Sequence, residues 1–321
     1  MTTTIKLDDW LPRIRKEYLQ DFVSKGGSAV KFIIPSDGVE TPQLAAGCGK
    51  MAAEEGFQYV FVDAANAQIH KVDHLFFAVA RQIDWDNLAY QYVQRLLVDK
   101  YQLPSSKIDF NIEKIAELNG RDVREMLPLI NELLTRHLYR DYEMTLEFRI
   151  AMLRLCQHQI DAGSVGSELC GVIKSWLKGE KVPVSALRPA IIFQKIGRHS
   201  ARHMLFSLAH WLRVTGTNGL IITLDIARYL QDRRPAEPDG TFYYSAAAAL
   251  DCYEVLRQFI DGADESKYLF ILVVAPNEFL NPDNLKRGVN AYDALKLRIW
   301  DEVYDRVRAN PLSSLVRIAS I

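Results

Sequence analysis

The chain has 321 residues, of which 49% are hydrophobic and 25% charged, and its formal net charge is −1. This is the composition of a globular protein, and the near-neutral balance excludes nucleic-acid binding driven by the charge of the whole chain. Its four cysteines lack metal-ligand spacing and no apolar run is long enough to cross a bilayer, so we expect a soluble, cytoplasmic protein with reduced thiols and no membrane partner.

Five short apolar runs are typical of strands that are buried on both faces of a parallel sheet. In chain order they are residues 29–34, 58–63, 219–225, 268–275 and 314–318. Helix-type periodicity separates them, which predicts an α/β core of the βαβ type.

Residues 70–190 interrupt this alternation with helical periodicity and no strand pattern. We therefore predict a large all-helical insertion between the second and third predicted strands. The chain would then divide into a first part of the α/β core at 1–69, the insertion at 70–190, and a second part of the core at 191–321.

The sequence Gly47-Cys48-Gly49-Lys50 looks like the end of a phosphate-binding loop, G-x-x-x-x-G-K-[ST]. A working loop, however, directly follows the first strand and opens a helix. The Gly-Cys-Gly-Lys sequence lies about a dozen residues beyond that strand, and the motif's first glycine and its hydroxyl residue would be Leu44 and Met51. We interpret it as the middle of an ordinary helix.

The expected position of a phosphate loop is residues 35–42, PSDGVETP, after which a helix begins with Thr41 as N-cap and Pro42 as its first residue. Aligned with the motif, Pro35 and Glu40 replace the two glycines. Thr41 replaces the lysine and Pro42 the hydroxyl residue. The topology thus predicts a P-loop fold whose loop residues have changed.

These replacements remove the chemistry of the loop. Pro42 has no backbone N–H to offer an oxygen. Asp37 and Glu40 place negative charge where a triphosphate would lie, which should cost roughly several kcal/mol in phosphate affinity. We predict a degenerate nucleotide site, in which Gly38 and Thr41 are vestigial loop residues.

Two later positions fit the same fold. Asp225 ends the third predicted strand as in a Walker B strand, where an Asp helps to hold Mg²⁺, but Ile226 stands where many ATPases carry a Glu. Asn277 follows the fourth strand, where a polar residue often senses the γ-phosphate; without a phosphate loop, a turn residue is the alternative interpretation. With the motif lysine and this Glu both absent, we predict no catalytic residue and no bound cofactor; no histidine cluster indicates a metal. ATP and Mg²⁺ belong only to the alternative, a divergent ATPase that uses Asp225.

The sequence VVAPNEF at residues 273–279 is followed by Arg-Gly-Val at 287–289 and by Tyr-x-Ala-Leu-x-x-Arg at 292–298. With these motifs the chain resembles, over almost its whole length, the BREX-type phage-resistance ATP-binding proteins, which are AAA-like P-loop ATPases. The resemblance implies an AAA-like P-loop fold and a place in a multi-gene antiviral system beside DNA-handling enzymes.

Combined with the altered motifs, the resemblance predicts a non-catalytic pseudo-ATPase subunit of an anti-phage complex. Such a subunit would scaffold or regulate a partner ATPase, helicase or nuclease. Arg287 and Arg298 fall where AAA-like proteins often keep residues that face a neighbouring subunit, so each is a candidate for a trans-acting arginine. Salt bridges to Asp or Glu are the alternative interpretation of both.

A further alternative is a DNA-binding module. Basic residues recur at i, i+3, i+4, i+7 and i+8 along one face of the helix that leads to the third strand. They are Lys195, Arg198, His199, Arg202 and His203. A solvated helix face is the competing interpretation.

Overall fold

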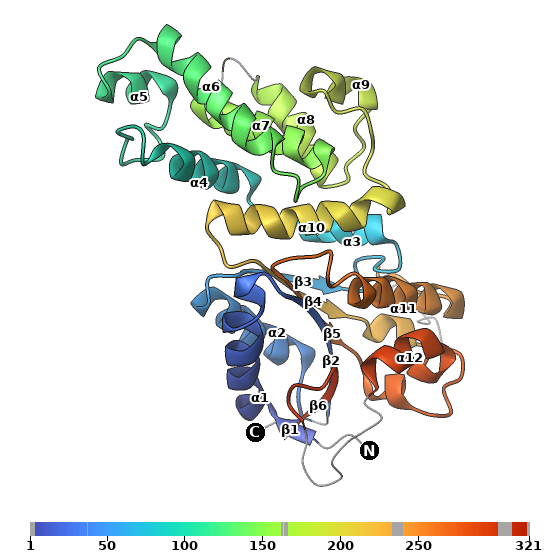
Figure 1. Cartoon of the computed structure of the whole chain (residues 1–321). Helices are drawn as coiled ribbons and strands as arrows, with labels where there is room; N and C mark the ends of the chain where they lie inside the picture. Colours follow the sequence, from blue (N-terminus) through green and yellow to red (C-terminus); the bar gives the residue numbers. More distant parts are fainter. Residues whose placement is uncertain are drawn as a thin grey trace. The chain divides into compact units, whose positions relative to one another are not determined.

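The computed structural model describes residues 4–36, 38–161, 163, 166–232, 240–300 and 310–319. The chain forms two compact units (Figure 1). One unit comprises Met1–Val79 and Thr217–Ile321, and contains the sheet. The other comprises Ala80–Gly216, and its described residues form helices and loops without a strand.

The first unit is built on a six-stranded, all-parallel sheet with the strand order β1-β6-β2-β5-β4-β3. The predicted α/β class is therefore confirmed, and each of the five predicted strands is found to within one residue at either end. The strands are β1 Thr4–Lys6, β2 Ser28–Pro35, β3 Gln58–Asp63, β4 Leu220–Asp225, β5 Leu269–Val274 and β6 Leu315–Ala319.

Strand β1 was not predicted, and it changes the numbering of the sheet. It is three residues long and pairs with β6, with Ile5 opposite Ile318. Because β1 comes first in the chain, the helical segment lies between β3 and β4. In the complete sheet, the second and third strands are β2 and β3. The prediction that the helical segment lies between the second and third strands is therefore wrong.

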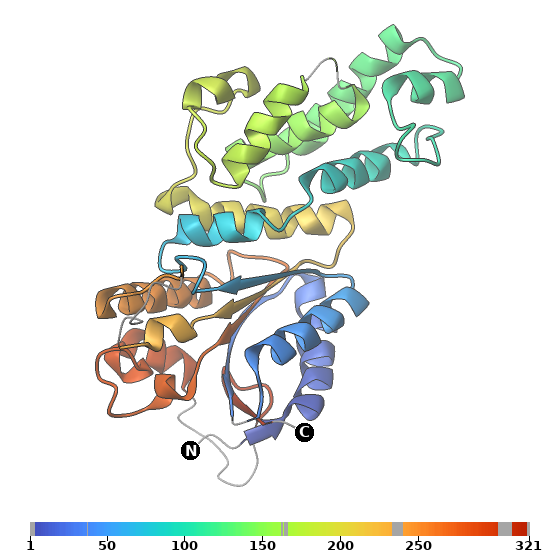
Figure 2. The ribbon, with the colours of Figure 1, turned by 180° about the vertical axis from the view of Figure 1, so that it is seen from behind.

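Helices cover both faces of this sheet, as seen in Figure 1 and from behind in Figure 2. On one face, Trp10, Leu44 and Met51 from two helices share a core with strand residues such as Ile33 and Phe270. The helices of this unit are α1 Leu7–Ile14, α2 Thr41–Glu54, α3 Val72–Ala80, α11 Ala246–Asp261 and α12 Asp293–Ile299.

The opposite face of the sheet lies toward α11. Phe32 of β2 stacks on Phe279 with ring centroids 5.9 Å apart, and Tyr253 of α11 meets Phe279 edge-on at 5.6 Å. Since Phe32 and Ile33 alternate along one strand, burial of both shows that the sheet is covered on both sides, as in other parallel sheets.

The second unit is helical. Aromatic pairs join its helices: Trp85 meets Phe148 at 6.1 Å and Tyr92 meets Trp211 at 4.7 Å. No helix in the described parts of either unit combines the length and the apolar character that a membrane span requires. The helices are α4 Trp85–Leu97, α5 Ile112–Leu118, α6 Val123–Tyr139, α7 Leu146–Ile160, α8 Ser167–Leu177, α9 Val184–Leu187 and α10 Arg198–Thr215.

Candidate functional site at the carboxyl ends of the strands

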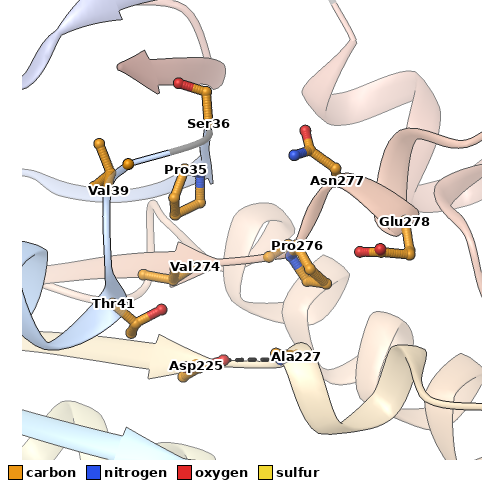
Figure 3. Close-up of a pocket in the computed structure, with 12 residues that line it drawn as sticks. Pro35, Ser36, Val39, Thr41, Asp225, Ala227, Val274, Pro276, Asn277 and Glu278 are labelled. Atoms are coloured by element: carbon orange, nitrogen blue, oxygen red, sulfur yellow. Dashed lines mark hydrogen bonds between the residues drawn. The ribbon is translucent and has the colours of Figure 1, made fainter. Parts of the chain in front are cut away.

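A cavity of about 340 Å³ opens at the carboxyl ends of β2, β4 and β5 (Figure 3). This is the edge at which open α/β sheets bind their ligands. The volume lies near the lower end of the range for small-molecule sites, roughly 300–1,000 Å³. The cavity is lined by Pro35, Ser36, Gly38, Val39, Thr41, Asp225, Ala227, Val274, Ala275, Pro276, Asn277 and Glu278.

The structure brings together the four residues that the sequence placed in a nucleotide site. Gly38 and Thr41 come from the segment between β2 and α2, Asp225 ends β4, and Asn277 follows β5. Parallel strands end at one edge of the sheet, which is why residues so far apart in sequence meet here. Ser36 and Glu278 were not predicted as site residues, although Ser36 lies within the predicted loop segment 35–42 and Glu278 directly follows Asn277.

The segment predicted to hold the phosphate loop, residues 35–42, donates hydrogen bonds within its own chain. Both the N–H and the hydroxyl of Ser36 donate to the carbonyl of Ile318, at 2.7 and 2.8 Å. The N–H of Val39 donates to the carbonyl of Ser36 at 3.1 Å. Asp37 lies outside the described residues. These donors are therefore already used, whereas a phosphate loop aims such groups at its ligand.

Helix α2 begins at Thr41, and Glu40 holds the N-cap position without a side-chain capping bond. The prediction of Thr41 as N-cap is therefore wrong by one residue. The side chains of Thr41 and Asp225 lie near each other in the wall of the cavity (Figure 3). The N–H groups of Gln43 and Leu44 both donate to the carbonyl of Glu40, and Pro42 has no N–H. The first turn thus offers an anion fewer donors than an ordinary helix N-terminus.

Asp225 is a partly desolvated carboxyl group beside the cavity. Burial raises its pKa, and the negative charge of Asp63, its register partner on β3, adds to this rise. The hydrogen bond from the Ala227 N–H, 2.8 Å from Asp225 Oδ1, opposes this rise in pKa, and so does the nearby Thr41 hydroxyl. Ionised Asp225 is thus less favoured than an exposed Asp, and a nearby cation would relieve this cost.

A side-chain hydrogen bond orients Asn277. Arg317 of β6 donates from Nη1 to Asn277 Oδ1 at 3.0 Å, which directs the amide nitrogen away from the guanidinium. Asn277 and Glu278 face the loop segment across the cavity (Figure 3). The described residues that line the cavity include two carboxyl groups, Asp225 and Glu278, and no Lys or Arg.

The two arginines considered as trans-acting groups are both bonded within the chain. Arg287 is only 5% exposed, and its guanidinium donates to the carbonyls of Tyr229 and Tyr244, each at 2.9 Å, and to Asp232 at 3.0 Å. Arg298 makes a bidentate ion pair with Asp261. Either guanidinium would have to leave these partners before it could act on a neighbouring subunit.

The basic residues near residue 200 do not all share one helix. Helix α10 begins at Arg198, because Gly197 takes the cap position and its N–H bonds Ser200 Oγ at 3.2 Å. The prediction that Lys195 lies on this helix is therefore wrong. Lys195 and Arg198 are exposed, whereas Arg202 is half-buried.

The Gly47-Cys48-Gly49-Lys50 sequence lies in the middle of α2, as predicted. Cys48 is buried in the core beneath the sheet, so this segment serves packing. In the described part of the chain, no group of three or more His, Cys, Asp or Glu side chains is arranged to hold a metal ion.

Residues 20–321 match the model of one protein family, described as BREX system ATP-binding protein BrxC/D. The match spans nearly the whole chain, so the chain belongs to this family of the BREX anti-phage system. Membership implies that other components of the system exist beside it. No match to the chain was found among curated proteins or among solved structures.

Proposed function

We propose that this member of the BREX family is a non-catalytic pseudo-ATPase with an AAA-like P-loop fold. It would scaffold or regulate a partner ATPase, helicase or nuclease of the same complex, without a bound nucleotide cofactor of its own. The observation that carries the proposal is the cavity. It occupies the position of a nucleotide site, yet its described lining holds two carboxyl groups and no cation.

Electrostatics support this proposal. A nucleotide triphosphate carries several negative charges, and phosphate sites balance them with Lys, Arg and backbone N–H groups. Two like charges about 4 Å apart repel by roughly 4 kcal/mol at an effective dielectric constant of about 20. Asp225 and Glu278 would therefore oppose a triphosphate, and the N–H groups of Ser36 and Val39 are already bonded within the chain.

The rival function is that of a divergent ATPase, and one observation favours it. Asp225, Thr41 and Asn277 all line the same cavity, so a magnesium ion at Asp225 would have a hydroxyl and an amide close by. Such an ion would reverse the local electrostatics and bring a phosphate within reach. The arrangement requires Asp225 to be ionised, against the direction in which burial moves its pKa.

Thermal unfolding of the purified chain in rising Mg-ATP separates the two functions. A ligand at a hundredfold excess over its Kd stabilises a protein by about 2.7 kcal/mol. We expect no saturable shift and no phosphate release. A shift that the Asp225→Ala variant loses would establish the divergent ATPase and refute the proposal.

A phage-challenge experiment tests the role in the complex. Cells that carry the complete system should lose protection when this chain is deleted. They should keep protection when Asp225 is replaced by Asn, because a scaffold needs the folded chain and not its carboxylate. Loss of protection by a folded Asp225→Asn variant would contradict a non-catalytic role.

A further inference from the structure

The segment between α9 and α10 exposes apolar side chains on an anchored backbone. Ile191 is 52% exposed and Phe193 is 61% exposed, while Ile192 between them is fully buried. The carbonyl of Gln194 accepts a hydrogen bond from Trp176 Nε1 at 3.1 Å. Since the backbone is fixed on both sides of Phe193, the two apolar side chains are held facing outward.

The backbone of Ile191 is in an unfavourable conformation, with φ 65° and ψ 31°. A β-branched residue rarely adopts this left-handed region, because its side chain crowds the backbone there. The Ile191 N–H donates to the carbonyl of Arg188 at 2.8 Å and closes the turn. The half-exposed side chain gains little packing in return, so the strain suggests that the turn serves to present this surface.

The same segment is positively charged. From residue 181 to residue 224 there is no Asp or Glu, although the chain's overall frequency of 40 acidic residues in 321 predicts five or six. Arg188, Lys195 and Arg198 flank the two apolar residues and are all exposed. The nearest acidic residue before the segment, Glu180, accepts a hydrogen bond from Ser175.

We propose that Arg188, Ile191, Phe193, Lys195 and Arg198, the 188–198 surface, bind single-stranded nucleic acid. The cations would contact phosphates while a base stacks on the ring of Phe193. A duplex keeps its base faces stacked inside, so an exposed aromatic ring among cations favours a single strand. The inference is independent of the cavity and holds whether or not the cavity binds a nucleotide.

Fluorescence anisotropy with a labelled oligothymidylate of about 20 nucleotides tests this on the full chain. The wild-type chain should bind, and Phe193→Ala should weaken binding by about fivefold or more, since stacking on one aromatic ring is worth at least about that factor. Phe193→Trp should retain binding because the larger ring still stacks. Ile108→Ala is the matched control: Ile108 is 93% exposed in the same unit, and its loss should change nothing.

The charge contribution is measured by salt dependence. Replacing both Lys195 and Arg198 by Gln should reduce the slope of log K against log salt by about 1.4, or about 0.7 per phosphate contact. All variants should unfold at the wild-type temperature, because the altered side chains are exposed.

Three results would overturn the proposal. The first is a wild-type chain that does not bind the oligonucleotide at low salt. The second is a Phe193→Ala variant that binds as tightly as wild type, which would leave only unspecific attraction by charge. The third is binding of polyglutamate, but not of the oligonucleotide, to the 188–198 surface. This would identify an acidic protein segment as the occupant.

Discussion

The two sides of the cavity differ in how their residues are held. On the side of β4 and β5, hydrogen bonds from Ala227 and Arg317 hold Asp225 and Asn277, two residues predicted to belong to a nucleotide site. On the side of the β2–α2 segment, the residues at the predicted loop positions differ from the phosphate-binding motif, and Ser36 is bonded to Ile318. The core of the sheet determines where the site lies, whereas loop residues, which pack little, decide what it binds.

The largest effect is expected from removing Arg287, which follows β5 and whose hydrogen bonds join it to the segment that follows β4. Arg287→Ala would leave the carbonyls of Tyr229 and Tyr244 buried without their donor. A buried polar group without a partner costs about 1–3 kcal/mol, so the free energy of unfolding should fall by about 2–5 kcal/mol. Urea denaturation measures this change.

Arg298→Ala is the matched control for that experiment. Its ion pair with Asp261 is partly exposed, and such pairs contribute about 0–1 kcal/mol. If both variants lost the same free energy of unfolding, the buried hydrogen bonds of Arg287 would contribute no more to stability than the partly exposed ion pair of Arg298.

The burial of Arg287 illustrates what the sequence could not supply. The apolar runs of the five longer strands were sufficient to predict them, because a strand buried on both faces must be apolar nearly throughout. The partners of Arg287, however, are carbonyls 43 and 58 residues away, and no local pattern encodes them. Strand β1 was missed for the same reason, since its pairing with β6 joins the two ends of the chain.

The site shows the same limit at closer range. That Gly38, Thr41, Asp225 and Asn277 would meet followed from the topology of a parallel sheet. The N-cap did not follow, because Glu40 holds that position without a side-chain hydrogen bond. Local propensity marks the first residue of a helix only where a side chain caps it.

An intermediate effect is expected from introducing residues of the phosphate-binding motif between β2 and α2. The triple variant Glu40→Gly, Thr41→Lys and Pro42→Thr places Gly-Lys-Thr at the start of α2, as in the phosphate-binding motif. If side chains alone distinguish the two sides of the cavity, Mg-ATP should stabilise this variant by about 2.7 kcal/mol at a hundredfold excess over Kd. Thermal shift and a filter-binding assay measure the change.

Glu40→Gly alone is the control, because it removes a negative charge without adding a cation. Stabilisation of the triple variant only would confirm that the loop side is what excludes the triphosphate. Failure of the triple variant would place the deficit in the backbone, where Ser36 is bonded to Ile318. The hypothesis that side chains alone distinguish the two sides of the cavity would then be wrong.

The smallest effect concerns Asp225, whose pKa is raised by burial. Above both its folded and unfolded pKa values, the ionised carboxylate destabilises the folded state; below the unfolded value, near 3.9, both states are protonated and the cost vanishes. Asp225→Asn keeps an oxygen that can accept from Ala227 and carries no charge. It should therefore raise the free energy of unfolding at pH 7 by less than about 1 kcal/mol, with a gain that shrinks through pH 4 and vanishes by about pH 3.

Denaturation at a series of pH values, with the exposed Asp99→Asn as control, tests this expectation. A loss of stability at pH 7 would mean that the hydrogen bonds of the carboxylate, such as the one from the Ala227 N–H, outweigh the cost of its burial. If the charge at Asp225 costs stability, the folded chain without a cation disfavours the ionised carboxylate, and that cost is what a bound Mg²⁺ would have to offset.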